Sequence, residues 1–262
     1  MKKKKRPKIG LALGSGGARG LAHIGVIKTL EKHGIPIDII AGSSIGAMIG
    51  GFYAAGLDTN QMEEITMKTD WRKIFSLVDP YLKQGLIKGN KIKDFIENYI
   101  NNKSFEDCQL PFAAICTDLK TGETIMLNKG KLSQAIMASI SIPLVFRPSR
   151  IDGRTLVDGG LSAPVPVKIV RQMGADIVIA VNLDQHYYDD AWKPKLYGIA
   201  NNSLGILRHH LALANTNDAD IVLNINIGKN YWYQFTNGGK KIFAGEKAME
   251  DSLEKLQMLI TK

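Results

Sequence analysis

Residues 8–55 read KIGLALGSGGARGLAHIGVIKTLEKHGIPIDIIAGSSIGAMIGGFYAA, and this stretch decides the fold. An apolar run at Lys8–Leu13 ends at a cluster of glycines, and Ala22–Lys32 follows with apolar residues at helical spacing. His33-Gly34 is typical of a helix C-terminus, Ile37–Ala41 is a second apolar run, and Ile45–Ala55 is helical again. A strand–helix–strand–helix order is typical of a parallel sheet with helices on its faces, so we expect an α/β fold.

The rest of the chain continues this alternation. We expect further strands at Phe112–Cys116, Thr124–Leu127, Thr155–Val157, Ile177–Val181 and Ile221–Leu223. We expect further helices at Asn60–Thr69, Lys91–Tyr99, Leu132–Ser139, Val167–Met173, Ser203–Leu213 and Glu246–Leu259. Thr121-Gly122, between Asp118 and Glu123, favours a tight turn that joins an antiparallel pair. No internal repeat or linker divides the chain, so residues 9–262 are predicted to form one domain.

The positive charge of the chain is concentrated at its beginning. The 262 residues carry a net charge of +9, and six of the 34 basic residues are Lys2, Lys3, Lys4, Lys5, Arg6 and Lys8. The remaining 28 basic residues are nearly balanced by 25 acidic ones, so the rest of the chain is close to neutral. We expect residues 1–8 to be a basic flexible tail, able to contact an anionic membrane or nucleic acid, with a solvated terminus as the alternative.

Two features bear on the compartment. Cys108 and Cys116 are too few for a disulfide scaffold or a four-cysteine metal site, which favours a reducing, cytoplasmic compartment. Ile39–Leu57 has no charged residue and is long enough to span a bilayer, but its glycines and paired serines favour a buried strand–turn–helix. The lysine run resembles the start of a signal peptide, but Arg19 and His23 interrupt the apolar region, so we expect no export.

The pentapeptide Gly42-Ser43-Ser44-Ile45-Gly46 lies between the second expected strand and the second expected helix. A serine on such a sharp turn projects its hydroxyl above the sheet edge, and the flanking glycines permit the crowded backbone. The helix N-terminus behind the serine favours negative charge that develops nearby. Ser44 is therefore a candidate nucleophile, and a small-residue turn without chemistry is the alternative.

The first glycine cluster, residues 14–20 (GSGGARG), also lies between a strand and a helix. Gly14, Gly16 and Gly20 give a loose dinucleotide-binding pattern, whereas consecutive N–H groups of the same loop would form an oxyanion hole. A dinucleotide fold needs a charged residue at the end of the second strand to bind the ribose. Here that strand ends in two serines and Asp38 lies at its start, so we favour the oxyanion hole.

A serine nucleophile needs a base. The five histidines are His23, His33, His186, His209 and His210, and none lies in a recognisable catalytic context. Asp158 follows the expected strand Thr155–Val157 and precedes Gly159-Gly160, which places a carboxylate at another strand end. An Asp-Gly-Gly turn with no chemistry is the alternative interpretation.

Four motifs, in this order and spacing along the chain, resemble those of the patatin-like phospholipases, specifically the short bacterial members: LGSGGARGLAHIGV, GSSIG, ASISIPLVF (Ala138–Phe146) and DGG. The resemblance runs from about Lys8 to the C-terminal helix. It implies a three-layer α/β/α fold with a mostly parallel sheet, and hydrolysis of lipid acyl esters without a metal or other cofactor. It implies Ser44 as nucleophile, Asp158 as base and an oxyanion hole at Ser15, Gly16 and Gly17. The supporting motif positions are Gly14, Arg19, Gly20, Gly42, Gly46, Gly159 and Gly160.

The resemblance has two departures. Ser15 replaces the first of three glycines in the family's loop, and Ala163 stands where the family often has asparagine. Neither change removes a backbone donor or Asp158. Arg19 is expected to hold the loop in shape, with a phosphate headgroup as its alternative partner.

Several alternatives stay open at this point. A carboxylate is a weak base, so we expect a partly desolvated site that raises the pKa of Asp158. A histidine after Asp158 would make a triad, and a non-catalytic lipid-binding protein would keep the fold without the reaction. The apolar stretch Met62–Leu77 is either a lid or membrane-facing edge within residues 60–85 or ordinary core. The lipid interpretation makes nucleic acid an unexpected partner and gives the tail a use at an anionic membrane surface.

Overall fold

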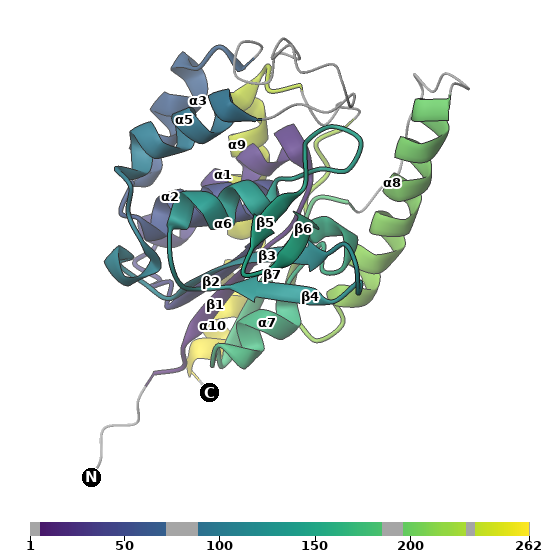
Figure 1. Ribbon diagram of the computed structural model, residues 1–262. Coiled ribbons are helices and arrows are strands. Elements are labelled where there is room, and N and C mark those ends of the chain that lie inside the picture. Colours follow the sequence, from purple (N-terminus) through teal and green to yellow (C-terminus); the bar gives the residue numbers. More distant parts are fainter. Residues whose placement is uncertain (1–5, 72–88, 185–195, 229–233, 262) are drawn as a thin grey trace.

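The computed structural model describes residues 6–71, 89–184, 196–228 and 234–261, and within them an eight-stranded sheet forms the centre of the molecule (Figure 1). Five strands are parallel, in the order β3-β2-β1-β7-β8: β1 (Ile9–Leu13), β2 (Ile39–Ser43), β3 (Phe112–Asp118), β7 (Ile177–Asn182) and β8 (Ile221–Asn224). Three antiparallel strands extend the β3 end: β4 (Thr124–Leu127), β5 (Ser149–Ile151) and β6 (Arg154–Asp158). The expected α/β class with a mostly parallel sheet is confirmed.

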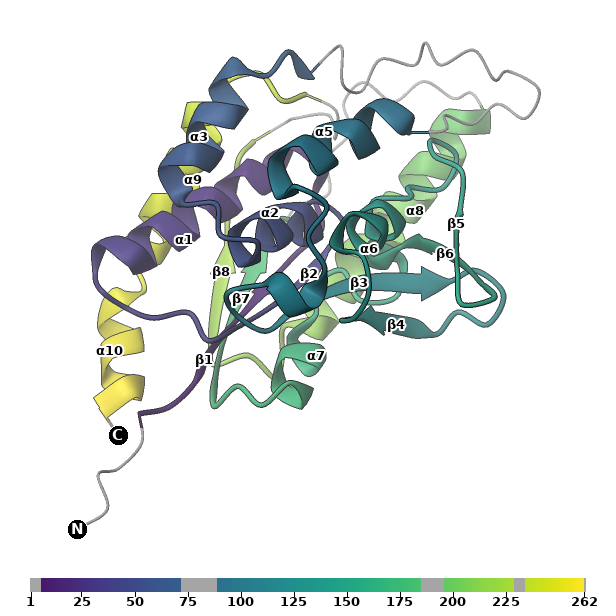
Figure 2. The same ribbon diagram turned by 60° about the vertical axis from the view of Figure 1, so that its left-hand side comes forward.

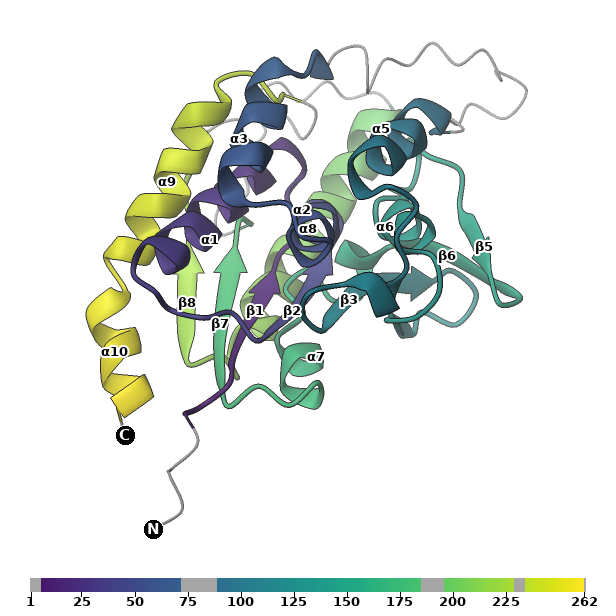
Figure 3. The same cartoon turned by 90° about the vertical axis from the view of Figure 1, so that its left-hand side faces the viewer.

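Helices cover both faces of the sheet, which gives three layers (Figures 2 and 3). One face is covered by α1 (Ala22–Lys32), α2 (Ile45–Ala54), α3 (Thr59–Lys68), α5 (Asn90–Ile100), α6 (Leu132–Ser139) and α9 (Gly238–Glu250). The other face is covered by α7 (Val167–Gln172) and α8 (Leu196–Asn215), and α10 (Leu253–Thr261) ends the chain. Strand side chains alternate between the layers: Leu11 and Leu13 pack under the larger set, and Ala12 packs under α7 and α8.

The two edges of β3 explain how the sheet places its functional ends. β4 pairs with residues 114–117 of β3 and occupies one edge. β2 pairs with residues 112–115 of β3 and β6 with residues 116–118. Both registers overlap that of β4, so β2 and β6 lie one after the other along the opposite edge. Because β2 runs parallel and β6 antiparallel to β3, their carboxyl ends meet. Ser43 lies opposite Ile115, and Asp158 lies opposite the next residue, Cys116.

The sequence-based elements match most of these bounds, and the differences have physical reasons. The helix predicted at Glu246–Leu259 is wrong: α9 begins at Gly238 and ends at Glu250, and α10 begins only at Leu253. The paired glycines at the start of α9 concealed its beginning. β5 was not predicted because three residues, SRI, carry no periodic signal. The turn at Thr121-Gly122 is confirmed, since the N–H of Gly122 donates to the carbonyl of Asp118 over 2.8 Å.

The first described residues, 6–8, lie at the edge of the sheet opposite the strand carboxyl ends. Residues 1–5, with Lys2 to Lys5, lie outside the described residues. Arg6 makes two 2.7 Å hydrogen bonds to Asp38, and the backbone N–H of Lys8 donates to Asp176. Two of the six basic residues assigned to the tail are therefore held at the base of the body, Arg6 by its side chain and Lys8 by its backbone.

The apolar stretch that follows α2 is only partly described. Met62 is buried in the main core, and Trp71 stacks on Phe235 with ring centroids 4.4 Å apart, so this part of the stretch is core packing. Residues 72–77, and with them most of the proposed lid, lie outside the described residues. Among the helices described, none combines the length and the apolar character needed to cross a bilayer.

Among the described helices, α1 and α9 make the most extensive contact with each other, and two glycines make it possible. A Cβ on Gly25 would lie 2.0 Å from the carbonyl oxygen of Ile242, and a Cβ on Gly245 would lie 1.9 Å from that of Ala22. The two backbones therefore touch, and no side chain fits between them.

Gly245→Ala is expected to lower the free energy of unfolding by at least about 1 kcal/mol, because the added methyl group must push the two helices apart. Gly239→Ala, in the same helix with open space around its Cβ position, should be neutral or stabilise by up to about 1 kcal/mol. Urea unfolding measures both. Equal effects of the two variants would contradict the close-packed crossing.

Candidate active site

Ser44 occupies a strained turn between β2 and α2. Its φ is +56°, a backbone conformation that non-glycine residues rarely adopt. The neighbouring glycines leave no room for side chains: a Cβ on Gly42 would lie 2.3 Å from the Gly46 carbonyl, and a Cβ on Gly46 would lie 2.2 Å from that of Leu13. This crowding holds Ser44 at the tip of the turn, as the pentapeptide predicts.

Asp158 ends β6 and meets Ser44 there. The Ser44 hydroxyl donates to Oδ2 of Asp158 over 2.5 Å, and the N–H of Gly160 donates to Oδ1 over 2.7 Å. Both side chains belong to buried residues, 4% and 7% exposed. Burial raises the pKa of Asp158 to about 6, although its two hydrogen bonds oppose that rise.

Two serines at the end of α6 and just after it hold the backbone of this pair. The N–H of Ser44 donates to Oγ of Ser139 over 2.9 Å, and that hydroxyl donates to the carbonyl of Ile115 over 2.6 Å. The N–H of Asp158 donates to the carbonyl of Ser141 over 3.0 Å. The sequence analysis used this segment only for its resemblance and missed these contacts.

The first glycine cluster leads into a short 3₁₀ helix, Gly17–Leu21, beside the Ser44 turn. Gly16 and Gly17 have φ values of +155° and +56°. Ser15 donates its N–H to the carbonyl of Pro164 over 2.8 Å, so this amide is occupied. Within the part of the chain that the structure describes, the N–H groups of Gly16 and Gly17 donate no hydrogen bond, which leaves these two as the candidates for an oxyanion hole.

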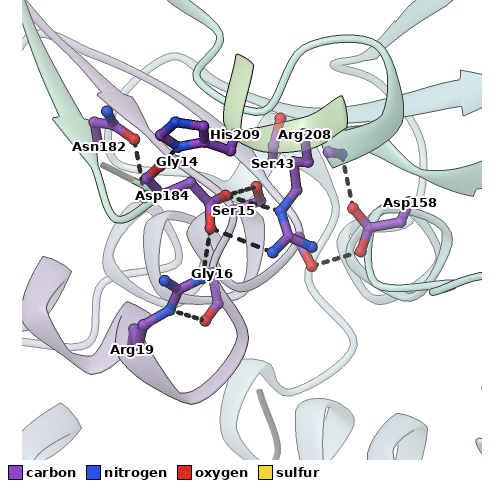
Figure 4. Close-up of polar contacts among 12 residues, drawn as sticks. Gly14, Ser15, Gly16, Arg19, Ser43, Asp158, Asn182, Asp184, Arg208 and His209 are labelled. Atoms are coloured by element: carbon purple, nitrogen blue, oxygen red, sulfur yellow. Dashed lines mark hydrogen bonds and ion pairs between the residues drawn. The ribbon is translucent and has the colours of Figure 1, made fainter. Parts of the chain in front are cut away.

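A buried carboxylate, Asp184, ties this loop to α8 (Figure 4). It accepts from Arg19 over 2.5 Å and from Nε of Arg208 over 2.8 Å, and the Ser15 hydroxyl donates to it over 3.3 Å. Arg19 also donates to the carbonyl of Gly16, which is the loop-holding contact that the sequence analysis favoured. Burial opposes ionisation of Asp184, but the cations of Arg208 and Arg19 outweigh it and lower the pKa to about 2.

Sequence reasoning missed Asp184 and Arg208. The available signal was position: Asp184 follows β7 as Ser44 follows β2 and Asp158 ends β6, and polar residues at the carboxyl ends of neighbouring strands meet at one edge. Arg208 has no comparable signal, because it lies inside a long, otherwise uncharged helix.

The described histidines do not hydrogen-bond to Ser44 or Asp158. His23 is fully buried and bonds to the carbonyl of Gly14, with its pKa lowered by burial to about 4. His33 pairs with Glu250, and Nδ1 of His209 lies 2.5 Å from the carbonyl oxygen of Asp184. His186 lies outside the described residues. The residues described also contain no cluster of three potential metal ligands.

The pKa of Asp158 makes a prediction for stability. A carboxyl group whose pKa is higher in the folded than in the unfolded protein makes the free energy of unfolding fall as pH rises. The fall begins near the ordinary carboxyl pKa and ends at about pH 6, above which the group is ionised in the folded protein as well. Asp158→Asn keeps the shape without the charge, so it should raise the free energy of unfolding by about 3 kcal/mol at pH 8 and by little at pH 4. Urea unfolding at both pH values measures this difference. A variant that is equally destabilised at both would refute the raised pKa.

Comparisons with known proteins identify the family of the chain. The family model of the patatin-like phospholipases matches residues 11–171. An uncharacterized NTE family protein of Mycobacterium bovis is 42% identical over 182 residues, covering 68% of this chain and 49% of that protein. Lysophospholipase nte1 of Emericella nidulans is 34% identical over 181 residues, covering 67% of this chain and 12% of that protein. The chain thus spans half or less of the length of these curated relatives.

Solved structures show the same fold. VipD from Legionella pneumophila superposes with a TM-score of 0.68 and 14% identity, covering 96% of this chain and 67% of that one. The type III effector protein ExoU superposes with a TM-score of 0.54 and 14% identity, covering 98% of this chain and 54% of that one. Residues 11–171, which the family model matches, contain the first glycine cluster, the Ser44 turn and Asp158. The chain therefore belongs to the patatin-like phospholipase family.

Proposed function

We propose that this protein hydrolyses carboxylic esters of lipids, with Ser44 as nucleophile and Asp158 as its base. The observation that carries the proposal is the 2.5 Å hydrogen bond from the Ser44 hydroxyl to the buried Asp158 carboxylate. Membership of the patatin-like phospholipase family and the relative named as a lysophospholipase support the substrate class. The proposal requires no metal or organic cofactor.

The reaction has two halves. Ser44 Oγ attacks the ester carbonyl carbon while its proton passes to Oδ2 of Asp158, and the tetrahedral intermediate collapses when that proton is given to the leaving alcohol. Water then attacks the acyl-enzyme, losing its proton to Asp158. The acid is released when Ser44 takes that proton back, which restores both groups.

The glycine loop supplies the second requirement, which is stabilisation of the oxyanion. The N–H groups of Gly16 and Gly17 have no acceptor in the described chain, and the Asp184–Arg19 pair holds the loop in this conformation. Loss of one oxyanion donor typically lowers kcat about 10²- to 10³-fold. These amides are therefore proposed as a large part of the rate enhancement.

Burial of Asp158 supports its role as a base. An ordinary carboxylate accepts protons poorly at neutral pH, and a pKa of about 6 brings it closer to the working range while it stays mostly ionised at pH 7. A non-catalytic lipid-binding protein would have no need of a desolvated carboxylate bonded to a strained serine.

Contact of the basic tail with an anionic membrane stays part of the proposal. Because Arg6 is held by Asp38 at the edge opposite Ser44, the tail would attract the protein to a surface without orienting the site toward it.

Ser44→Ala and Asp158→Asn are each expected to lower kcat/KM for p-nitrophenyl esters and phospholipids by at least about 10³-fold. Ser203→Ala, in α8, and Asp251→Asn, in the turn after α9, change the same residue types at exposed positions and should keep full activity. Ester hydrolysis and labelling by a fluorophosphonate probe are the measurements. Turnover of Ser44→Ala or Asp158→Asn at the wild-type rate would overturn the dyad.

The pH profile of kcat/KM gives an independent test. Asp158 must be ionised to take the proton, so kcat/KM should rise tenfold per pH unit below about pH 6 and level off above it. A plateau that extends down to pH 4.5 would show that another group is the base.

A further inference from the structure

We propose that Arg208 is a positioning residue that acts on Asp158, the base of the reaction. Asp184 holds its guanidinium where the positive charge keeps the Asp158 carboxylate ionised, which is the form that can take the proton of Ser44. Arg208 belongs to α8, which supplies none of the groups assigned to the reaction so far. The proposal rests on the proposed ester hydrolysis and adds to it a residue outside the Ser44–Asp158 pair and the glycine loop.

Asp184 fixes the orientation of the Arg208 side chain by two hydrogen bonds. Nε of Arg208 donates to Oδ2 over 2.8 Å and Nη2 donates to Oδ1 over 3.2 Å, a two-point geometry that makes arginine–carboxylate pairs directional. Asp184 is itself held in place, because it is only 5% exposed and its N–H donates to the side chain of Asn182 over 2.9 Å. The positive charge of Arg208 therefore has a defined position in the folded protein.

Arg208 lies on the side of Asp184 that faces the reacting pair. Figure 4 shows its guanidinium between the carboxylates of Asp184 and Asp158, and its charge lowers the pKa of Asp158 against the larger effect of burial. The hydrogen bonds that Asp158 accepts come from Ser44 and Gly160, so Arg208 acts on the base through space. A cation that is not bonded to the base leaves Oδ2 available for the proton of Ser44.

The charge cluster around Asp184 is positive overall, because two arginines share one carboxylate. Arg19 donates to Oδ1 of Asp184 over 2.5 Å, and Arg208 donates to both of its oxygens. The charge of Arg208 lowers the pKa of Asp158 more than the charge of Asp184 raises it. The cluster therefore favours the ionised base.

The other titratable side chains beside Asp158 do not duplicate this charge within the part of the chain that the structure describes. Cys116 lies opposite Asp158 in the β3–β6 ladder, and burial raises the pKa of its thiol, so it stays neutral. His209 follows Arg208 in α8, but its Nδ1 lies 2.5 Å from the backbone carbonyl oxygen of Asp184. Removal of Arg208 therefore takes away the cation that the described residues place beside the base.

Burial of Asp158 makes this cation necessary. A carboxyl group buried without a compensating charge reaches a pKa of about 8–9, and such a base would be almost wholly protonated at pH 7. With the charge of Arg208 beside it, the pKa of Asp158 is about 6, so most of the base is ionised at pH 7 and still accepts protons better than an exposed carboxylate. Burial supplies the basicity, and Arg208 limits it.

The test is the pH dependence of kcat/KM for p-nitrophenyl butyrate in variants of the ion pair. Arg208→Met removes the positive charge and should move the rise of kcat/KM upward by about one pH unit, which lowers kcat/KM at pH 6 about fivefold and leaves the alkaline plateau near its wild-type height. Asp184→Asn removes the negative charge and should move the rise downward in pH, whatever its effect on the height of the plateau. Loss of structure would not displace the two profiles in opposite directions.

Three further variants serve as controls. Arg208→Lys keeps the positive charge and should restore most of the wild-type profile. Arg171→Met should keep that profile, because Arg171 is also 33% exposed and paired with an aspartate, Asp220, but lies beside Asp176 at the opposite edge of the sheet. His209→Gln should leave the rise in place. A rise that disappears in His209→Gln would show that this histidine is the titrating group, and the proposal would be wrong.

An NMR titration without substrate separates this proposal from the proposed function. The side-chain carboxyl resonance of Asp158, assigned by its loss in Asp158→Asn, gives the pKa of that group directly. If esters are hydrolysed but this pKa is the same in the wild type, Arg208→Met and Asp184→Asn, the positioning role is wrong. If no ester is hydrolysed but the pKa rises in Arg208→Met and falls in Asp184→Asn, the electrostatic role holds and the proposed reaction fails. If Arg208→Met does not fold, Asp184→Asn gives the same test with the opposite sign.

Discussion

The constraint on which the rest of the molecule depends is that two strands share one edge of β3, end to end. β2 and β6 approach each other from opposite directions, so the residues at their carboxyl ends meet without any long loop to carry them. Ser44 and Asp158 then form their hydrogen bond across a junction that the backbone ladder has already fixed. The glycines around the junction allow this close approach, because a Cβ on Gly159 would lie only 2.2 Å from the carbonyl oxygen of Ile115.

Two buried carboxylates, Asp184 and Asp158, have pKa values that differ because their charged surroundings differ. Asp184 receives the cations of Arg19 and Arg208, so it stays ionised and anchors the glycine loop and α8. Among the described residues, Asp158 accepts hydrogen bonds from the Ser44 hydroxyl and the Gly160 N–H and has no cation bonded to it, so burial outweighs these bonds and the more distant charge of Arg208 and raises its pKa. Environments that push two pKa values apart are the usual means by which a protein keeps one carboxylate as structure and another as a base.

The strand–helix alternation and the Ser44 turn could be predicted from the sequence, because glycine spacing and helical periodicity are both visible within a short stretch of residues. The contacts that complete the site depend on segments far apart in the chain. Asp184 pairs with Arg19 across 165 positions, and no local pattern indicates that pairing. The hydrogen bond that occupies the N–H of Ser15 could not be predicted either, since its acceptor, Pro164, comes after Asp158 in the sequence. The expected rise in the pKa of Asp158 followed from chemistry, because a carboxylate base for serine needs desolvation.

The shared edge of β3 also sets an order in time. Ser44 and Asp158 are separated by 114 positions, and synthesis proceeds at about 5–20 residues per second, so the aspartate leaves the ribosome on the order of ten seconds after the serine. During that interval β2 can already pair with β1, but the serine has no proton acceptor. The proposed nucleophile therefore stays without its base until β6 has been synthesised and has joined the edge of β3.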